Sequence, residues 1–424
     1  MNLSLPTIPS LPTLPKLKRR RHGAPDSEMS RALKYIDAYW QRLERYHPED
    51  EGTVIGLPNA FIVPSYDDRE SFNYEEQYYW DSYFVAKGLM DNDHQELVEG
   101  MLENLSHLQQ RFGVIPNASR MYMLGHSQPP IFTTYILDVY EHYDKDKDWL
   151  LGHMARAEDE YHKTWMNDKH PQWHLVHRGL SRYYDINVLH DLAECESGWD
   201  MTTRFERKCL DYLPVDLNAL LFKYEMDFAQ TAETIGDEYH AAEWRKRAET
   251  RKKTMNELMW SKSKGFYFDY NYNRGVRGGV WSLAGFFPMW AGMASDEQAE
   301  RMVSNLEKFE KEGGLTTTTR PLIDMSIFGS LKTQWAYPNG WAPLHMIVVD
   351  GLKRYGYIEE AERIQRKWLK TNLDWFHKHG VFLEKYNMVS PHKHPVEGVY
   401  PSQSGFGWTN AVFKLFADDL GLTE

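Results

Sequence analysis

Two carboxylic acids of this chain lie in short segments that combine aromatic residues with glycine or an amide. Asp200 ends the segment Glu-Ser-Gly-Trp-Asp at 196–200, and Glu384 begins Glu-Lys-Tyr-Asn at 384–387. Hydrolysis of a glycosidic bond needs two such groups, one protonated to release the leaving oxygen and one ionised to activate water. Burial in a loop raises a carboxyl pKa and so can separate the two roles. Asp200 also precedes residues 201–203 (Met-Thr-Thr), so capping a helix is its alternative role.

Tryptophan and tyrosine recur in segments of the same kind. The chain has 15 Trp and 26 Tyr, and aromatics make up 14% of its residues. Aromatic rings stack on the apolar faces of sugars, while amides and carboxylates bind hydroxyl groups. Segments that combine these residue types with Gly or Pro are 78–84, 116–130, 196–200, 334–343 and 384–410. They predict a sugar site built from loops, with Trp199, Trp335, Trp341 and Trp408 as candidate contacts. A helical core rich in tryptophan is the alternative explanation.

The elements that must position these loops are predicted to be helices. Apolar residues recur at helical spacing over 28–46, 94–111, 216–235, 237–260, 295–309, a stretch ending at 355, and 358–376. Gly236 separates two of these helices, which predicts an antiparallel pair. Ser295 and Gln298 form the pattern of a capping box. Strand-like alternation is rare and no 34-residue period recurs, so the sequence predicts an all-α toroid of paired helices with the site at one end.

Several of the loop segments resemble the motifs of one known family. Residues 334–343 resemble the trehalase signature QWD-x-P-N-G-W-A-P, and 405–410 resemble its ending GFGWTN. Residues 78–83 match its block YYWDSY, and 116–117 with 127–130 match PN and SQPP. Together the motifs run from about residue 55 to about residue 415 in the family's order. The chain is therefore similar to trehalases over nearly its whole length.

The resemblance implies an (α/α)6 barrel and an inverting mechanism. It implies Asp200 as general acid and Glu384 as general base. The family's substrate contacts fall on Trp80, Asp81, Asn117, Gln128 and Gly198. A small α-glycoside, with trehalose first among the candidates, is the expected substrate.

Four positions depart from the trehalase pattern. Asn73 and His126 replace arginines, Ala336 replaces the signature aspartate, and Val399 replaces a glutamate. The arginine-containing PRPE segment has no clear counterpart. Because these groups gather around the sugars in trehalases, glucosylglycerate, mannosylglycerate and an α-gluco-disaccharide stay open as alternative substrates. An inactive sugar-binding barrel is a further alternative, but binding alone needs no acid and base pair.

The composition excludes several partners and compartments. The net charge of −12 is unfavourable for binding nucleic acid or an anionic membrane. No window approaches the roughly 18 apolar residues that span a bilayer. The two cysteines, Cys195 and Cys209, form no disulfide framework, so a cytoplasmic location is expected. The oligomeric state is left open.

The first residues differ in composition from the rest. Proline recurs every third residue from Pro6 to Pro15, and a basic cluster follows at 16–21. This pattern predicts a flexible leader over 1–26, with a docking arm as the alternative, and a single catalytic domain over 27–424.

No metal or cofactor is predicted. The acidic run at 144–148 fails as a calcium loop because Trp149 takes the glycine position. His392, His394 and Glu397 lack a fourth ligand. The sequence contains no glycine-rich phosphate loop and no G-x-S-x-G motif.

Overall fold

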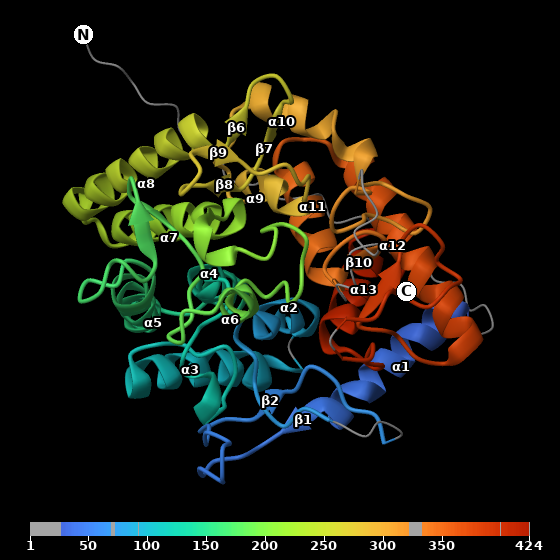
Figure 1. Cartoon of the computed structure of the whole chain (residues 1–424). Coiled ribbons are helices and arrows are strands. Elements are labelled where there is room, and N and C mark those ends of the chain that lie inside the picture. Colours follow the sequence, from blue (N-terminus) through green and yellow to red (C-terminus); the bar gives the residue numbers. More distant parts are fainter. Residues whose placement is uncertain (1–26, 69–72, 92, 322–332, 399, 424) are drawn as a thin grey trace.

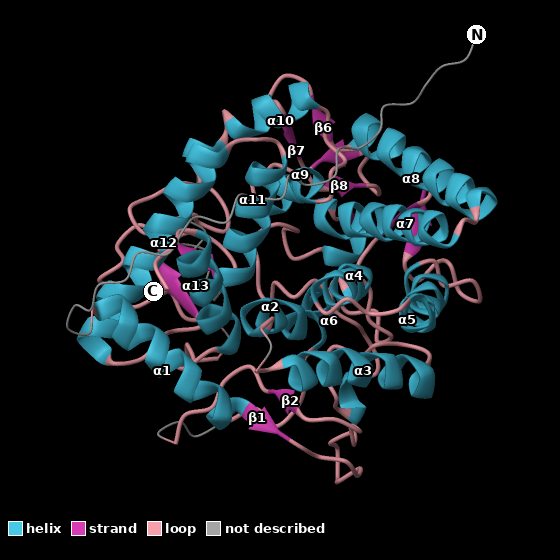
Figure 2. Ribbon diagram, turned by 180° about the vertical axis from the view of Figure 1, so that it is seen from behind, coloured by secondary structure: helices cyan, strands magenta, loops and turns pink. Residues whose placement is uncertain are grey.

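The computed structural model describes residues 27–68, 73–91, 93–321, 333–398 and 400–423. The predicted leader over 1–26 and Val399 lie outside the described residues. Helices make up most of the described chain, as predicted, and strands are short and confined to connections, as Figure 2 shows.

Within the described ranges, six helices form an inner ring. They are α2 (Tyr79–Leu89), α4 (Phe132–His142), α7 (Val215–Ile235), α9 (Phe287–Trp290), α11 (Ala342–Arg354) and α13 (Gly407–Asp419). Each contacts the next in chain order, and α13 contacts α2, so the ring closes (Figure 1). These helices are buried nearly all round, and on α2 every residue except Lys87 is buried. An all-round apolar helix belongs in a core.

A second set of helices alternates with the inner ones along the chain and covers them. These are α1 (Glu28–Leu43), α3 (Gln95–Phe112), α5 (Lys147–Glu160), α8 (Glu238–Leu258), α10 (Asp296–Val303) and α12 (Ile358–His379). The predicted antiparallel pair is α7 and α8, joined at Gly236 with a φ of 83°. Asp237 then caps α8 by accepting from the backbone N–H of His240. The alternation of inner and outer helices is that of an (α/α)6 barrel.

Shorter elements complete the chain. They are α6 (His190–Glu196), the 3-10 helices Met121–Met123, Cys209–Asp211, Leu283–Phe286 and Leu306–Lys308, and the π-helical turn Tyr161–Trp165. The strands are β1 (Glu44–Arg45), β2 (Phe61–Ile62), β3 (Leu175–His177), β4 (Leu180–Ser181), β5 (Tyr212–Leu213), β6 (Trp260–Ser261), β7 (Phe266–Tyr267), β8 (Tyr270–Asn271), β9 (Val276–Arg277), β10 (Asn339–Trp341) and β11 (Lys385–Asn387). All pairings are antiparallel: β1–β2, β3–β4, β5–β8–β9, β6–β7 and β10–β11. No described helix has the length and apolar character to cross a membrane.

Two predicted helices end early. The capping box of Ser295 and Gln298 is present, but α10 ends at Val303 instead of continuing to 309. The side-chain amide of Asn305 donates to the backbone oxygens of Lys264 and Gly265, which binds the chain to the β6–β7 turn instead of a further helical turn. The first helix likewise ends at Leu43, where β1 begins its pairing with β2.

The alternation places the candidate loops together. Because inner and outer helices follow one another antiparallel, all inner helices run in the same direction. Their N-terminal ends, and the loops that precede them, gather at one end of the ring. The pairing of β10 with β11 shows this directly, since it joins the loops before α11 and α13.

The ring closes through a contact between its first and last inner helices. A Cβ atom on Gly88 of α2 would lie 2.4 Å from the Cα of Ala411 on α13. Only glycine allows the two backbones to approach this closely. On the loops in front of these helices, the Ser404 hydroxyl donates to Asp67 Oδ2 at 2.6 Å.

Candidate active site

The loop that carries Asp200 follows α6 and is held by two buried glutamates. Glu194 Oε1 accepts from the Thr202 backbone N–H at 2.5 Å. The Glu196 carboxylate accepts from the backbone N–H groups of Ser127 and Tyr184 at 2.9 and 2.6 Å. Residues 201–208 form bends and turns, so the helix-cap interpretation of Asp200 is wrong. The loop is instead fixed from both sides by hydrogen bonds to buried carboxylates.

The carboxyl group of Asp200 lies in an environment that favours its protonated form. Burial and, to a smaller extent, the charge of Glu384 raise its pKa from 3.8 to about 7. Its own backbone amide and Lys385 act in the opposite direction. Among the described residues, no side chain hydrogen-bonds to this carboxyl group. A substantial fraction of Asp200 is therefore protonated at neutral pH, as a general acid requires.

The carboxylate of Glu384 has charged and polar partners. The hydroxyl of Tyr400 donates to Oε1 at 2.9 Å, and the ammonium of Lys385 donates to Oε2 at 2.5 Å. The Glu384 side chain is 1% exposed and that of Lys385 is fully buried. The backbone oxygen of Glu384 accepts from Trp408 Nε1 at 3.3 Å. Charge-assisted bonds of this kind fix the position of the Glu384 carboxylate.

A third carboxyl group and two phenols belong to the same cluster. Asp81 lies in the first turn of α2, and its pKa is raised well above the usual range, first by burial and then by Glu384 and Asp200. Burial also raises the pKa of Tyr74 and Tyr400, and the same two carboxylates contribute to both shifts. Asp200 and Glu384 thus contribute to the pKa shifts of all three groups. The five groups therefore lie close together at one end of the barrel.

The five tryptophans proposed to contact substrate are packed against one another. Trp335 stacks on Trp341 with ring centroids 3.7 Å apart, and on Trp199 at 5.7 Å. Trp408 meets both Trp335 and Trp341 edge-on, and Trp80 lies 6.0 Å from Trp335. All five are at most 4% exposed. The cluster links the residue before Asp200 to the loop that carries Glu384 and forms a rigid support for both.

The remaining predicted contacts connect three loops around Trp80. Gly198 has a φ of 70°, and a Cβ there would lie 2.8 Å from the Trp80 ring. Gln128 Oε1 accepts from the Trp80 backbone N–H at 3.0 Å. The side-chain amide of Asn117 donates to the backbone oxygens of Ser127 and Cys195 at 3.1 and 3.2 Å. The structure thus brings every sequence-predicted site residue into one connected region.

Comparison with known proteins identifies the family. The family model described as trehalase matches residues 15–194 and 185–421. The chain belongs to the trehalase family. It is 33% identical to a cytosolic neutral trehalase of Beauveria bassiana over 85% of this chain, and spans 58% of that relative's length. A cytosolic neutral trehalase of Kluyveromyces lactis is also 33% identical, over 86% of this chain and 57% of its own.

Solved structures give the same fold. The neutral trehalase of Saccharomyces cerevisiae is 28% identical with a TM-score of 0.73, covering 91% of this chain and 79% of that one. A mannosylglycerate hydrolase of Thermus thermophilus, 19% identical with a TM-score of 0.67, shares the fold over 91% and 99% of the two chains. The predicted (α/α)6 barrel is thereby confirmed.

The positions that depart from the trehalase pattern serve the local structure of the loops. The side chain of Asn73 exchanges hydrogen bonds with the backbone of Asp67 at 2.9 and 3.3 Å. His126 Nδ1 lies 2.8 Å from Asp185 Oδ2, and Ala336 is buried. Asn73 and His126 thus stabilise the loops at two positions where trehalases carry an arginine.

Sequence reasoning missed Tyr74, Tyr400 and the role of Lys385. Tyr74 lies four residues before the segment 78–84, and Lys385 and Tyr400 lie inside the segment 384–410. Proximity to the motifs was a usable signal, whereas the hydrogen bonds to Glu384 depend on the fold. The histidine and glutamate weighed as metal ligands, His392 and Glu397, are exposed, and His394 packs edge-on against Trp375.

Proposed function

We propose that this chain is an inverting α-glycoside hydrolase that splits trehalose into two glucose molecules. Asp200 donates its proton to the bridging oxygen as the bond to the anomeric carbon breaks. Glu384 accepts a proton from a water that attacks the same carbon from the opposite face. Two hydroxyl groups are thereby formed from one water, and no cofactor or metal enters the balance.

One observation carries this proposal: the two carboxyl groups have opposite surroundings. Burial raises the pKa of Asp200 to about 7, while an ammonium and a phenol donate hydrogen bonds to Glu384. Pairs of carboxyl groups that differ in this way mark an acid and a base. Membership of the trehalase family supports trehalose as the substrate.

The other predicted residues receive binding and positioning roles under this proposal. Asp81, on the first turn of α2, accepts from sugar hydroxyls. Asn117 and Gln128 supply amide groups beside Trp80, and Gly198 leaves room for the Trp80 ring. Trp199, Trp335, Trp341 and Trp408 form the wall that holds the two loops in place.

The stereochemistry of the products tests the proposal. Inversion converts the attacked ring of trehalose to β-glucose and releases the other ring as α-glucose. Proton NMR in the first minutes should therefore show the two anomers in equal amounts before mutarotation. Initial formation of α-glucose alone would mean retention and would remove Glu384 as the water-activating base.

A different small α-glycoside is the second candidate substrate. It is favoured by the loss of the family's arginines at Asn73 and His126. Rates on trehalose, glucosylglycerate, mannosylglycerate and kojibiose should be compared under identical conditions. The highest kcat/KM on trehalose supports the first candidate, and turnover of none would favour an inactive sugar-binding barrel.

We also propose a cytoplasmic location and a separate leader. The location is supported by relatives that are named cytosolic. The leader, residues 1–26, is expected to contribute little because its composition offers little apolar area to bury. Its deletion should leave kcat and Tm unchanged, and a fall of several degrees in Tm would show that it packs on the barrel at 27–424.

A further inference from the structure

The segment 334–341 is bonded directly to the loop that carries Asp200. The side-chain amide of Gln334 donates from Nε2 to the backbone oxygen of Asp200 at 2.6 Å. One residue further along both segments, the backbone N–H of Trp335 donates to the backbone oxygen of Met201 at 3.0 Å. The Gln334 side chain is fully buried. Together the two bonds fix the stretch of backbone that carries the Asp200 carboxyl group.

The bond to Asp200 sets the orientation of the Gln334 amide. Only the amide nitrogen can donate to a carbonyl oxygen, so the amide oxygen must point the other way. It faces Gly398, where a Cβ atom would lie 2.5 Å from Oε1. Within the part of the chain that the structure describes, Oε1 has no hydrogen-bond partner. The bond to Asp200 is therefore the one hydrogen bond that this side chain makes to a described residue.

The backbone of Gln334 is bonded to the loops around the base. Its carbonyl oxygen accepts from Asn339 Nδ2 at 3.0 Å and from Trp341 Nε1 at 3.2 Å. Asn339 also exchanges two hydrogen bonds with the backbone of Val396, at 2.7 and 2.9 Å. Trp341 lies opposite Lys385 in the pairing of β10 with β11, directly after the candidate base. Gln334 therefore connects the acid to the framework that carries the base.

The Asp200 carboxyl group depends on this backbone for its position. No side chain of the described residues hydrogen-bonds to it, whereas Lys385 and Tyr400 bind the carboxylate of Glu384. A general acid must lie within hydrogen-bond reach of the oxygen that it protonates. A displacement of about 1 Å can cost about 10²-fold in rate. A side chain that holds the backbone of Asp200 can therefore control proton transfer without touching the substrate.

We propose that Gln334 is a positioning residue for the general acid, because its amide holds the Asp200 backbone where the carboxyl group reaches the glycosidic oxygen. The inference rests on the proposed function, in which Asp200 protonates that oxygen as the bond to the anomeric carbon breaks. Replacing the Gln334 side chain should leave the bonds of its backbone oxygen to Asn339 and Trp341 in place. The attack of water, which Glu384 assists, should therefore be affected much less than the proton transfer.

The leaving group of the substrate separates this role from a purely structural one. Trehalose needs a proton on the departing oxygen. Fluoride leaves α-glucosyl fluoride as a stable anion with the bonding electron pair, so this hydrolysis needs the water and the base but little help from the acid. Gln334→Met should lower kcat on trehalose about tenfold, the size expected for one lost hydrogen bond. The KM for trehalose and the kcat on α-glucosyl fluoride should stay within about twofold, as measured by initial rates of glucose and fluoride release.

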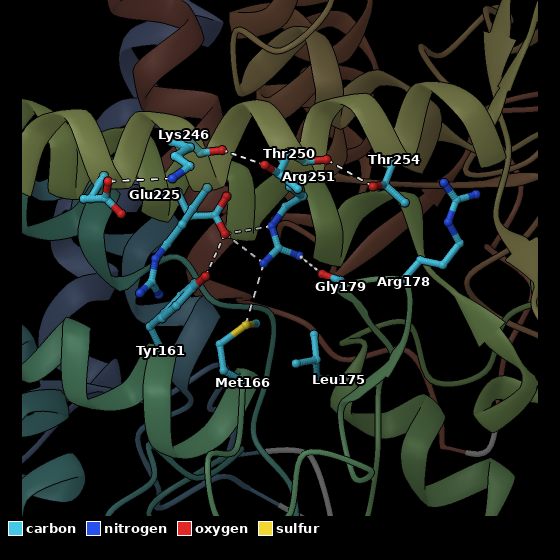
Figure 3. A pocket seen from close by; sticks show the side chains of 12 residues that line it. Tyr161, Met166, Leu175, Arg178, Gly179, Glu225, Lys246, Thr250, Arg251 and Thr254 are labelled. Carbon is cyan, nitrogen blue, oxygen red and sulfur yellow. Dashed lines mark hydrogen bonds and ion pairs between the residues drawn. The ribbon is translucent and has the colours of Figure 1, made fainter.

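Two control variants remove a comparable buried hydrogen bond elsewhere. Gln365→Met, on α12, removes the 2.8 Å bond that another fully buried glutamine donates to Asp419. Tyr161→Phe removes the 2.7 Å bond from the π-helical turn to Glu225 of α7 (Figure 3). Both should leave kcat on both substrates within about twofold, because neither bond reaches the loops that carry the acid and the base.

Three results would overturn the inference. An equal fall on trehalose and on α-glucosyl fluoride would mean that Gln334 supports the site as a whole. Unchanged kcat on trehalose would mean that Asp200 keeps its position without the amide. The same loss in Gln365→Met would mean that any buried glutamine has this effect. If Gln334→Met does not fold, Gln334→Leu also removes the donor and carries the same test.

Asp200→Asn distinguishes failure of this inference from failure of the proposed function. It should lower kcat on trehalose by at least about 10²-fold and kcat on α-glucosyl fluoride much less. If Asp200→Asn shows this contrast and Gln334→Met does not, the inference alone is wrong. If Asp200→Asn loses both activities equally, Asp200 is not the acid, and the proposed function fails together with the inference.

Discussion

Asp200 and Glu384 have the same chemistry in water but different surroundings in the barrel. The backbone oxygen of Asp200 accepts from the Gln334 side-chain amide. Its carboxyl group has no such partner among the described side chains, and desolvation is the main reason that its pKa is raised to about 7. Glu384 is held by its carboxylate, through the Lys385 ammonium and the Tyr400 hydroxyl. In the proposed mechanism, the acid and base roles therefore depend on the groups that the loops place beside each carboxyl group, and not on the residue type.

Removing either carboxyl group should have the largest effect. Asp200→Asn and Glu384→Gln should each lower kcat on trehalose by at least about 10²-fold, because each removes an acid or a base. Glu397→Gln is the matched control, since this carboxylate is exposed and should leave kcat unchanged. Wild-type turnover in either variant would show that the residue has no part in the mechanism, and the contrast between acid and base would then have no catalytic meaning.

The pH dependence of activity tests the role proposed for Asp200 separately from that of Glu384. In the proposed mechanism Asp200 acts in its protonated form, whose fraction falls as the pH rises through about 7. The value of kcat/KM should therefore fall about tenfold for each pH unit above 7. Initial rates from pH 5 to pH 9 measure this limb. A profile that stays flat to pH 9 would contradict the role given to Asp200.

Loss of the phenol beside the base should have a smaller effect. Tyr400→Phe removes the hydrogen bond to Glu384 Oε1 but keeps the ring and the Lys385 ammonium. We expect kcat to fall about tenfold, the scale of one hydrogen bond, while the alkaline limb stays near pH 7. Tyr122→Phe, at a residue that is 62% exposed, is the control. A shift of the limb without a loss of kcat would connect Tyr400 to Asp200 instead.

The smallest expected effect is on thermal stability, and the change in Tm should have opposite signs in the Asp200 and Glu384 variants. The pKa of Asp200 is raised from 3.8 to about 7 on folding, so its ionisation costs stability as pH rises through that range. Asp200→Asn should thus raise Tm by at least about 2 °C at pH 8, and by less at pH 5. Glu384→Gln should lower Tm, because it leaves the buried Lys385 ammonium without its carboxylate. Calorimetric scans giving the same sign for both would contradict the contrast.

The outer helices were predicted better than the inner ones, and the reason is burial. α3 and α12 each have one apolar and one charged face, so their periodicity shows in the sequence. α2 and α13 are buried nearly all round, and a helix without a polar face leaves no such pattern. Of the inner helices, only α7 and α11 were predicted from hydrophobic periodicity, and the closed ring was inferred from the family resemblance.

The candidate site was predictable in its members but not in its electrostatics. The motif segments identified Asp200 and Glu384 as the candidate acid and base. The sequence does not show which groups lie beside each of the two carboxyl groups. The ammonium of Lys385 donates to Glu384 from the start of β11, a strand that pairs with β10. Such a contact depends on the fold, so no spacing rule reveals it.

The contact of α2 with α13 has a consequence for the folding of the chain during its synthesis on the ribosome. Asp81 stands on the first inner helix and Glu384 on the loop before the last, and the bond from Ser404 to Asp67 joins residues 337 positions apart. Synthesis is slow and proceeds from the N-terminus, so the first five inner helices are made before their closing partner. A nascent chain that stops before α13 contains both Asp200 and Glu384 but has no closed ring. Under the proposed function, activity would therefore appear only after α13 has packed against α2 at Gly88 and Ala411.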